Sequence, residues 1–221
     1  MLIFYKDMKT FRVRKLYPPL ENERTVQAST LVRYLRKLHN LHKCFWLMDR
    51  LQVLSFGAGV QSTSMFLMSV NGFFKKVDHV IFADTGFEPD YVYEQVNRCE
   101  KISKDNDIGF HIVKADFKDS HENIYTHTME AAKGNTSRYS GFPMYMKKGF
   151  IRRQCTNDFK IQPIRKKIRE LLGLKKGQRA GKEILVDQWI GISMDEIQRT
   201  RRNRDIWINN YYPLIEKNLN R

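Results

Sequence analysis

Short apolar runs and segments of helical spacing alternate along most of this chain. Runs bounded by polar or glycine-containing turns predict four strands, at residues 51–56, 78–84, 108–114 and 184–192. Apolar residues spaced three or four apart predict four helices between them, at residues 61–70, 90–103, 120–133 and 164–172. Residues 134–150 are rich in glycine, tyrosine and lysine, and are predicted to be a long binding loop.

The first 47 residues follow a different pattern. Residues 1–25 show no clear period, whereas residues 28–47 are predicted to form a basic amphipathic helix with leucines at helical spacing. The strand and helix rhythm begins only near Met48. We therefore expect residues 1–47 to be an N-terminal extension that a domain at residues 48–221 does not need.

Length, apolar content and cysteine usage limit the class of protein. A chain of 221 residues with 42% hydrophobic residues can bury one good core. It has no apolar run of about 18 residues, so no membrane span is expected. Cys44, Cys99 and Cys155 form no C-x-x-C pair, which argues against a disulfide scaffold or a zinc ribbon and suits a reducing cytoplasm.

The net charge of +15 is concentrated at the two ends of the chain. Residues 1–50 carry 11 basic and 4 acidic side chains, residues 51–150 carry 11 and 12, and residues 151–221 carry 17 and 8. Such asymmetry favours a polyanionic partner, either a nucleotide or a nucleic acid. A solvated basic surface is the alternative.

Residues 53–67 have the composition of an anion site. They begin as an apolar strand, pass through Gly57 and Gly59, and continue as a helix that starts near Ser62 and Thr63. The first amides of a helix lack backbone partners, and glycines let a phosphate approach the backbone. A hydroxyl of Ser62 or Thr63 is predicted to cap the helix and to donate to a phosphate oxygen.

The alternative for this stretch is a tight turn with a serine cap and no ligand, because lone glycine motifs are weak evidence. Two common phosphate motifs fit poorly. A P-loop needs a lysine after its second glycine, and a dinucleotide-binding turn needs a third glycine where this chain has Ser62.

The run S-F-G-A-G-V-Q-S-T, from Ser55 to Thr63, resembles the S-F-S-G-G-K-D-S-T loop of the PP-loop ATP pyrophosphatases. The resemblance is closest to the branch that contains PAPS reductase and its phage and bacterial relatives. In that family the loop binds the phosphates of an adenine nucleotide. Val60 and Gln61 stand where many members have lysine and aspartate, so a loop charge and a possible metal contact are missing.

A second motif, D-T-G-F-E-P, starts at Asp84 and resembles the D-T-G-x-E segment of the same relatives. A carboxylate at the end of a parallel strand points into the ligand crevice of a doubly wound sheet. A turn or cap residue is the alternative for Asp84. The nucleotide-binding residues implied by the resemblance are Ser55, Gly57, Gly59, Gln61, Ser62, Thr63, Asp84 and Thr85.

A third motif, at residues 151–164, resembles the C-T-x-x-x-K-I-x-P-I segment of the family. Its cations suit a charged, oxygen-rich ligand, and its Cys-Thr pair is expected to line the substrate. The residues concerned are Arg152, Arg153, Cys155, Thr156 and Lys160. Cys155 is expected to be structural or substrate-lining, because the reductases carry their catalytic cysteine near the C-terminus and no cysteine follows Cys155 here.

A fourth motif, G-I-S-M-D-E-I-Q-R, resembles the family's G-I-x-x-D-E-x-x-R. Its Asp195, Glu196 and Arg199 are expected to close the far wall of the site. More arginines follow at 201–204, for which a nucleic-acid-facing patch or a solvated face is the alternative. Relatives continue with a cysteine-bearing segment, so this chain is expected to be short at its C-terminus.

The four motifs together imply an α/β fold with a doubly wound, mainly parallel, twisted sheet, of the adenine nucleotide alpha hydrolase-like (HUP) type. The implied function is chemistry at the α-phosphate of ATP or on a PAPS-like phosphosulfate nucleotide. Arg153, Lys160 and Asp195 are then the expected catalytic residues, and Mg²⁺ is expected if the nucleotide is ATP. The competing hypotheses are a nucleic-acid-binding or thiolating protein on the same fold, and an inactive truncated family member.

Overall fold

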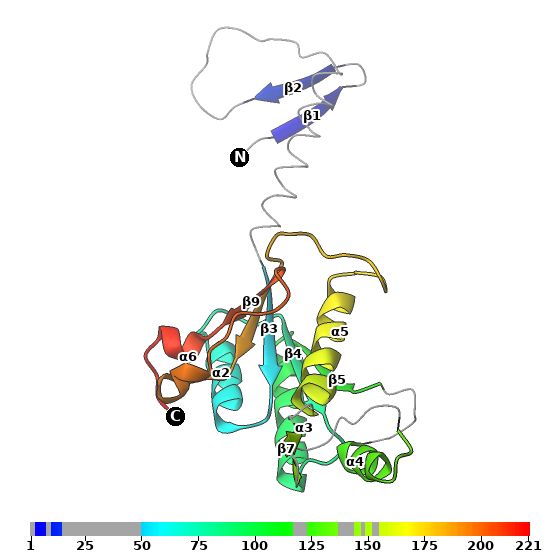
Figure 1. Cartoon of the computed structure of the whole chain (residues 1–221). Coiled ribbons are helices and arrows are strands. Elements are labelled where there is room, and N and C mark those ends of the chain that lie inside the picture. Colours follow the sequence, from blue (N-terminus) through cyan, green and yellow to red (C-terminus); the bar gives the residue numbers. More distant parts are fainter. Residues whose placement is uncertain are drawn as a thin grey trace. The chain divides into compact units, whose positions relative to one another are not determined.

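Five parallel strands form the sheet of residues 50–221 in the computed structural model (Figure 1). They are β3 (Leu51–Phe56), β4 (His79–Asp84), β5 (Gly109–Lys114), β8 (Val186–Ile190) and β9 (Ile208–Tyr211). Their order across the sheet is β5-β4-β3-β8-β9, and every neighbouring pair is parallel. The four predicted strands are confirmed, and β9 is a strand that the sequence pattern did not predict.

The structure describes residues 3–7, 10–14, 50–116, 123–136, 144–146, 149–151 and 155–221. The chain divides into two compact units, residues 1–49 and 50–221. In the first unit β1 (Ile3–Asp7) pairs antiparallel with β2 (Thr10–Arg14), where the sequence showed no clear period. The basic helix predicted at residues 28–47 lies outside the described residues.

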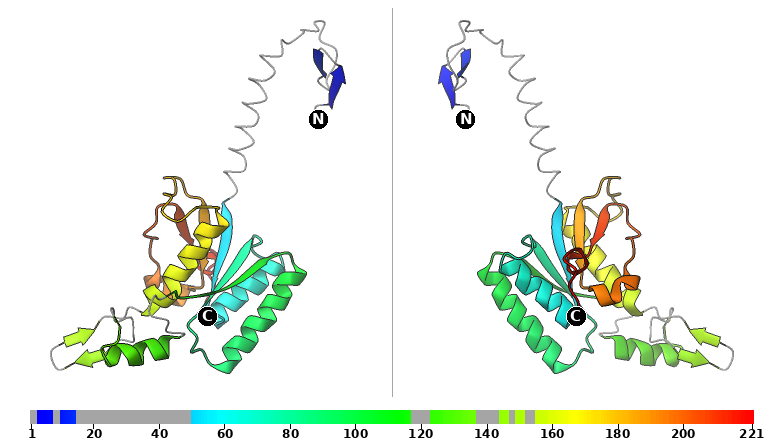
Figure 2. Two further views of the ribbon diagram at one scale, coloured as in Figure 1. Left: turned by 90° about the vertical axis from the view of Figure 1, so that its right-hand side faces the viewer. Right: turned by 90° about the vertical axis from the view of Figure 1, so that its left-hand side faces the viewer.

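Helices cover both faces of the parallel sheet (Figure 2). On one face α2 (Val60–Val70) and α3 (Asp90–Asp105) pack against strand residues such as Leu54, Phe82 and Trp189. On the other face α5 (Gln162–Leu171) packs against Val53 and Ile81. Successive strand residues point to opposite faces, so strands buried on both faces read as continuous apolar runs. The prediction of a doubly wound α/β fold is confirmed at this level.

The remaining elements lie around the carboxyl ends of the strands or at the sheet edge. They are α4 (Ile124–Ala132), β6 (Met144–Met146), β7 (Gly149–Ile151), the π-helix η1 (Thr156–Ile161), the 3₁₀-helix η2 (Met194–Arg199) and α6 (Pro213–Glu216). β6 and β7 pair antiparallel. The prediction of an unbroken loop at residues 134–150 is therefore wrong, because β6 and the start of β7 satisfy part of its backbone.

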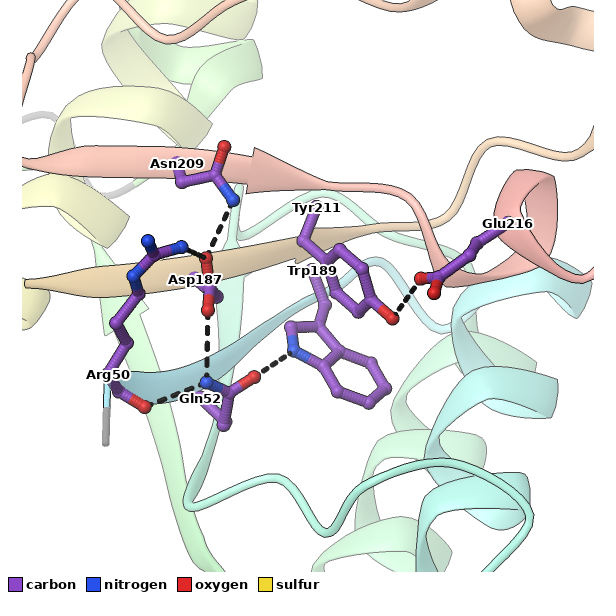
Figure 3. Close-up of polar contacts among 7 residues, drawn as sticks. All are labelled: Arg50, Gln52, Asp187, Trp189, Asn209, Tyr211 and Glu216. Atoms are coloured by element: carbon purple, nitrogen blue, oxygen red, sulfur yellow. Dashed lines mark hydrogen bonds and ion pairs between the residues drawn. The ribbon is translucent and has the colours of Figure 1, made fainter. Parts of the chain in front are cut away.

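A polar network on the α2 face ties together β3, β8 and β9 (Figure 3). The Asp187 carboxylate accepts hydrogen bonds from Arg50 at 3.1 Å, Gln52 at 3.2 Å and Asn209 at 2.7 Å. The Gln52 carbonyl in turn accepts from the indole nitrogen of Trp189 at 2.9 Å. These bonds satisfy polar side chains on three neighbouring strands, which explains how a strand as polar as β9 is accommodated.

Two histidines on neighbouring strands predict a pH-dependent stability. His79 of β4 and His111 of β5 have ring nitrogens 3.2 Å apart, and burial lowers the pKa of both below 6.5. The charge of Lys167 lowers both pKa values further. Asp78 raises the pKa of His79, and Glu170 raises that of His111. The unfolded chain therefore binds more protons below pH 6.5, so the free energy of unfolding should fall as the pH decreases from there.

Urea titrations between about pH 8 and pH 5 measure this dependence. His111→Gln removes one of the two titrating rings and should flatten it. An equally steep fall in that variant would show that other groups cause the dependence.

Candidate nucleotide-binding site

The direction of the sheet order reverses between β3 and β8. From β3 the chain passes outward to β4 and β5, and it then returns to the other side of β3 to form β8 and β9. In open parallel sheets ligands bind beyond the carboxyl ends of the strands at such a point. The glycine loop after β3 and the Gly191 turn after β8 both lie at this end of the sheet, so we take it as the candidate site.

The N-terminus of α2 leaves backbone amides available in this crevice. The first helical hydrogen bond runs from the amide of Thr63 to the carbonyl of Gly59 at 3.0 Å. The amides of Val60, Gln61 and Ser62 precede it and have no acceptor within the helix. No side chain caps this end, and its first turn carries no acidic residue. The partial positive charge of the helix end is therefore open to an anion.

Ser62 holds the glycine loop in place and does not cap the helix, which corrects the predicted capping role. Its hydroxyl accepts a hydrogen bond from the Gly57 amide at 3.3 Å and donates to the Gly59 carbonyl at 3.2 Å. The Thr63 hydroxyl is buried and has no hydrogen-bond partner among the described residues. The loop is thus closed by its own helix, and the helix amides remain free.

We expect measurable backbone strain at Ala58, which lies between the two glycines. Its φ is 55°, in the left-handed region that costs a residue with a Cβ about 1–2 kcal/mol. Ala58→Gly should relieve this strain, but glycine loses more chain entropy on folding, which offsets part of the gain. The free energy of unfolding should therefore stay equal or rise by up to about 1 kcal/mol. Ala58→Val should destabilise the domain. Urea unfolding of both variants measures the difference, and a valine variant as stable as the glycine variant would contradict the strain.

Gln61 joins the two sides of the crevice. Its amide nitrogen donates to the Ser193 hydroxyl at 2.9 Å and to the Glu196 carboxylate at 2.8 Å. Ser193 in turn donates to Asp195 at 2.6 Å, and Arg199 donates to Glu196 at 2.6 Å. These bonds lower the pKa of both carboxyl groups, chiefly through Ser193 for Asp195 and through Gln61 for Glu196. Both carboxylates are therefore held ionised beside the glycine loop.

Gly191 and Ser193 are residues of this site that the sequence analysis did not assign. A Cβ placed on Gly191 would lie 3.1 Å from the amide nitrogen of Ser62, so glycine lets the turn after β8 approach α2 closely. Ser193 is fully buried between Gln61 and Asp195. The available signal was the Gly-Ile-Ser sequence at the end of a predicted strand, which matches the small-residue turn after β3.

Ser55 lies on the α5 face of β3 and contacts β8. Its hydroxyl accepts a hydrogen bond from Gln188 at 2.7 Å, and Gln188 accepts one from Asn203 at 3.2 Å. The structure therefore gives Ser55 an interstrand contact. Its predicted contact with a nucleotide stays a prediction.

A second group of predicted residues lies at the end of β4. Asp84 accepts hydrogen bonds from the Gly86 amide at 2.7 Å and the Tyr93 hydroxyl at 3.0 Å, and pairs with Lys114 at 3.3 Å. The bond to the Gly86 amide, two residues on, is typical of an Asp turn. Asp84 therefore makes the contact expected if it is a turn residue. Three protein partners leave this carboxylate less available to a ligand than the sequence suggested.

Glu88 connects the second and third motifs. Its carboxylate accepts hydrogen bonds from the Thr85 hydroxyl at 2.9 Å and from Lys160 at 3.3 Å. The Lys160 side chain remains 45% exposed, so it can still reach a ligand. Glu88 was part of the quoted motif but was not assigned to the site. Thr85, Glu88 and Lys160 therefore form one group beside β4, next to the glycine loop of β3.

Cys155 and Thr156 begin the π-helix that carries Lys160. Cys155 is buried against Ile124 and Phe159, and its expected role, structural or substrate-lining, stays a prediction. The Thr156 hydroxyl is buried without a hydrogen-bond partner among the described residues. Pro163 lacks an amide proton and stands at the start of α5, which accounts for the wider turns before it. π-Helical turns are rare in proteins, and those that do occur are often found at functional sites.

Some predicted features lie outside what the structure describes. Arg152 and Arg153 belong to the residues that are not described, so their predicted roles stay predictions. In the described ranges no group of three or more His, Cys, Asp or Glu side chains is arranged to hold a metal ion. The predicted Mg²⁺ stays a prediction.

Comparisons with protein-family models, curated proteins and solved structures found no match to this chain. Among the described helices none combines the length and the apolar character that crossing a membrane requires. The described residues therefore define an α/β protein with a five-stranded parallel sheet. Its candidate anion site lies where the strand order reverses, between β3 and β8.

Proposed function

We propose that this chain binds an adenine nucleotide through its phosphates at the crevice between β3 and β8, as the PP-loop ATP pyrophosphatases do. The finer fold assignment, to the adenine nucleotide alpha hydrolase-like group, is part of this proposal. The observation that supports it most strongly is the N-terminus of α2, which no side chain caps and which lies where the strand order reverses. The glycine loop before it is closed by the hydrogen bonds of Ser62.

The free amides of α2 and the loop backbone would hold the phosphates. A Cβ added at Gly57 or at Gly59 would have no heavy atom within 4 Å, so a ligand can approach the backbone there. Lys160, with Arg152 and Arg153, would neutralise charge on the leaving group. With ATP, an oxygen of water or of an acceptor would attack the α-phosphorus and form a new P–O bond. The bond to the bridging oxygen would break, which releases pyrophosphate and leaves AMP or an adenylylated acceptor.

Gln61 distinguishes this chain from the PP-loop proteins that have aspartate in the loop. Gln61 replaces that aspartate and donates to Glu196 from across the crevice. We infer that the carboxylate next to the phosphates is supplied here by the turn after β8. If Mg²⁺ is bound, Asp195 and Glu196 would contribute carboxylate oxygens to its coordination.

Calorimetry with ATP, AMP and PAPS, each with and without Mg²⁺, tests the proposal. Binding of ATP or PAPS with an affinity well above that of AMP is expected, because the proposed site would contact the groups beyond the α-phosphate. Product analysis then separates the reactions, since pyrophosphate reports α-phosphate chemistry on ATP and sulfite reports reduction of PAPS. No measurable binding of any of the three nucleotides would overturn the proposal.

The second candidate function is modification of a nucleic acid after activation by the nucleotide. It is favoured by the exposed guanidinium groups of Arg201, Arg202 and Arg204, for which the described residues provide no ion pair. These arginines closely follow the crevice residue Arg199 in the chain, so a nucleic acid bound by them would lie near the nucleotide.

A further inference from the structure

A cavity of about 670 Å³ lies beside the edge strand β9. Its walls are formed by Ile184, by residues 197, 200–203, 205 and 206 of the connection from β8, by residues 208–210 of β9, and by Tyr212 and Ile215 at α6. A connection between parallel strands usually packs a helix on the sheet. Here the connection has the short η2 and then residues 200–207 without a helix, so part of this face is left open. A hollow of this volume is large enough to hold a small organic group.

The charge of the cavity is positive. Arg201 and Arg202 are exposed along its wall, and neither forms an ion pair with any described residue. Asp205, the acidic residue of the lining, is bonded to Arg165 at 2.5 Å. Two guanidinium groups therefore face an opening in which the carboxylate is already neutralised. This arrangement fits an anion that carries several oxygens, such as a phosphate.

The backbone that presents these arginines is held by side chains of β9 and its end. The Arg201 amide donates to the Tyr212 hydroxyl at 2.9 Å, and that hydroxyl donates to the Arg201 carbonyl at 2.7 Å. Asn210 donates to the same carbonyl at 2.8 Å, and Asn203 donates to Asn210 at 2.8 Å. The backbone of Arg201 is thus held in place before any ligand arrives, which reduces the backbone part of the entropy cost of binding.

The cavity also has an apolar side. Ile184, Ile197 and Ile206 line it and are 39%, 47% and 64% exposed. Aliphatic side chains beside guanidinium groups suit a ligand with a flat apolar body and a phosphate. An unpaired nucleotide has both parts, whereas a duplex keeps its bases stacked inside and offers mainly its phosphates.

We propose that this cavity binds unpaired nucleotides of a single-stranded nucleic acid, with phosphates on Arg201 and Arg202 and a base against the isoleucines. The site is distinct from the glycine-loop crevice. It does not depend on nucleotide binding in that crevice, but it rests on the second candidate function, which uses the same arginines. The strand would be the acceptor if both sites are occupied, because Glu196 directly precedes Ile197 of the cavity wall.

Fluorescence anisotropy with labelled single-stranded DNA and RNA, and with the same DNA as a duplex, tests the proposal. The double variant Arg201→Gln with Arg202→Gln should bind the preferred strand at least tenfold more weakly. The slope of log affinity against log salt should decrease by about 1.4, since each phosphate contact contributes about 0.7 for single strands. Stronger binding of DNA or of RNA identifies the natural strand.

Two further variants separate the cavity from general charge. Arg98→Gln with Lys101→Gln removes the same charge from exposed positions on α3, which covers the opposite face of the sheet, and should leave binding nearly unchanged. Ile206→Ser should weaken single-strand binding several-fold and duplex binding little. Gly59→Val should retain strand binding even where it loses ATP, which keeps this inference separable from the nucleotide site.

The proposal fails if the α3 double variant loses as much affinity as the cavity variant, because binding would then follow net charge alone. It also fails if duplex binds as tightly as single strand with the same response to Ile206→Ser. Binding of an acidic peptide at the cavity in preference to either strand would assign the surface to a protein partner instead.

Discussion

Gly59→Val should abolish most of the ATP affinity and leave the domain folded. Gly59 has φ −83° and ψ 171°, an extended conformation that valine adopts readily. No heavy atom lies within 4 Å of the position that its Cβ would take, so the protein itself loses nothing. A bound phosphate would occupy that open space, and the valine methyl groups would exclude it. We expect a loss of ten- to a hundredfold, about 1.4–2.8 kcal/mol, by calorimetry.

The stability of this variant is the necessary second measurement. Its free energy of unfolding should change by less than about 0.5 kcal/mol, as is usual for exposed positions. Gly181→Val is the matched control, because Gly181 has a similarly open Cβ position and precedes β8 at the opposite end of the sheet. Unchanged ATP binding in Gly59→Val would show that the glycine loop is only a tight turn and does not bind phosphate. Equal loss in Gly181→Val would show that the effect is not local.

Trp189→Ala should destabilise the domain by about 3–5 kcal/mol, the range found for removal of large buried aromatic side chains. Trp189 is 1% exposed and packs edge-on against Phe74 at 5.9 Å and Tyr211 at 5.3 Å between ring centres. Its indole also donates to Gln52, so alanine both leaves a cavity and removes a hydrogen bond from a buried carbonyl (Figure 3). Urea denaturation measures the change in the free energy of unfolding.

Two variants divide this effect into its parts. Trp189→Phe keeps most of the volume but not the donor, and should cost about 1–3 kcal/mol. Phe73→Ala removes an aromatic ring that is 57% exposed and touches Phe74 from outside, and should cost less than about 1 kcal/mol. If Trp189→Ala costs no more than Phe73→Ala, the core does not depend on this indole as the structure indicates.

The sequence predicted β3 and β4 because each is an apolar run that is buried on both faces of the sheet. It predicted β5 from alternating residues, and β8 from a short segment that contains the buried Val186 and Trp189. It did not predict β9, whose residues are Ile-Asn-Asn-Tyr. Asn209 bonds to Asp187 and Asn210 accepts from Asn203, and these partners become neighbours only in the folded chain. A polar edge strand is thus determined by its partners and not by its own pattern.

The candidate site shows the same division. The glycines, the helix start after β3 and the carboxylates after β8 could be identified from the sequence, since turn chemistry depends on neighbouring residues. The role of Ser62 could not, because a serine near a helix start can cap the helix or, as here, close the preceding loop. The π-helix before α5 is an intermediate case. Pro163 indicates that the helix is irregular near its start, but the sequence does not show that the irregular turns are π-helical.

The sequence by itself determined the succession of strand, small-residue turn and helix, because these depend on residues within a few positions of one another. Only the tertiary structure decided which turns share a site. Gln61 meets Ser193 and Glu196 across 132 and 135 residues, and Lys160 meets Glu88 across 72. Those contacts follow from the strand order β5-β4-β3-β8-β9, which places the ends of β3 and β8 side by side. Strand order is set by the packing of the whole sheet, and no local pattern in the chain encodes it.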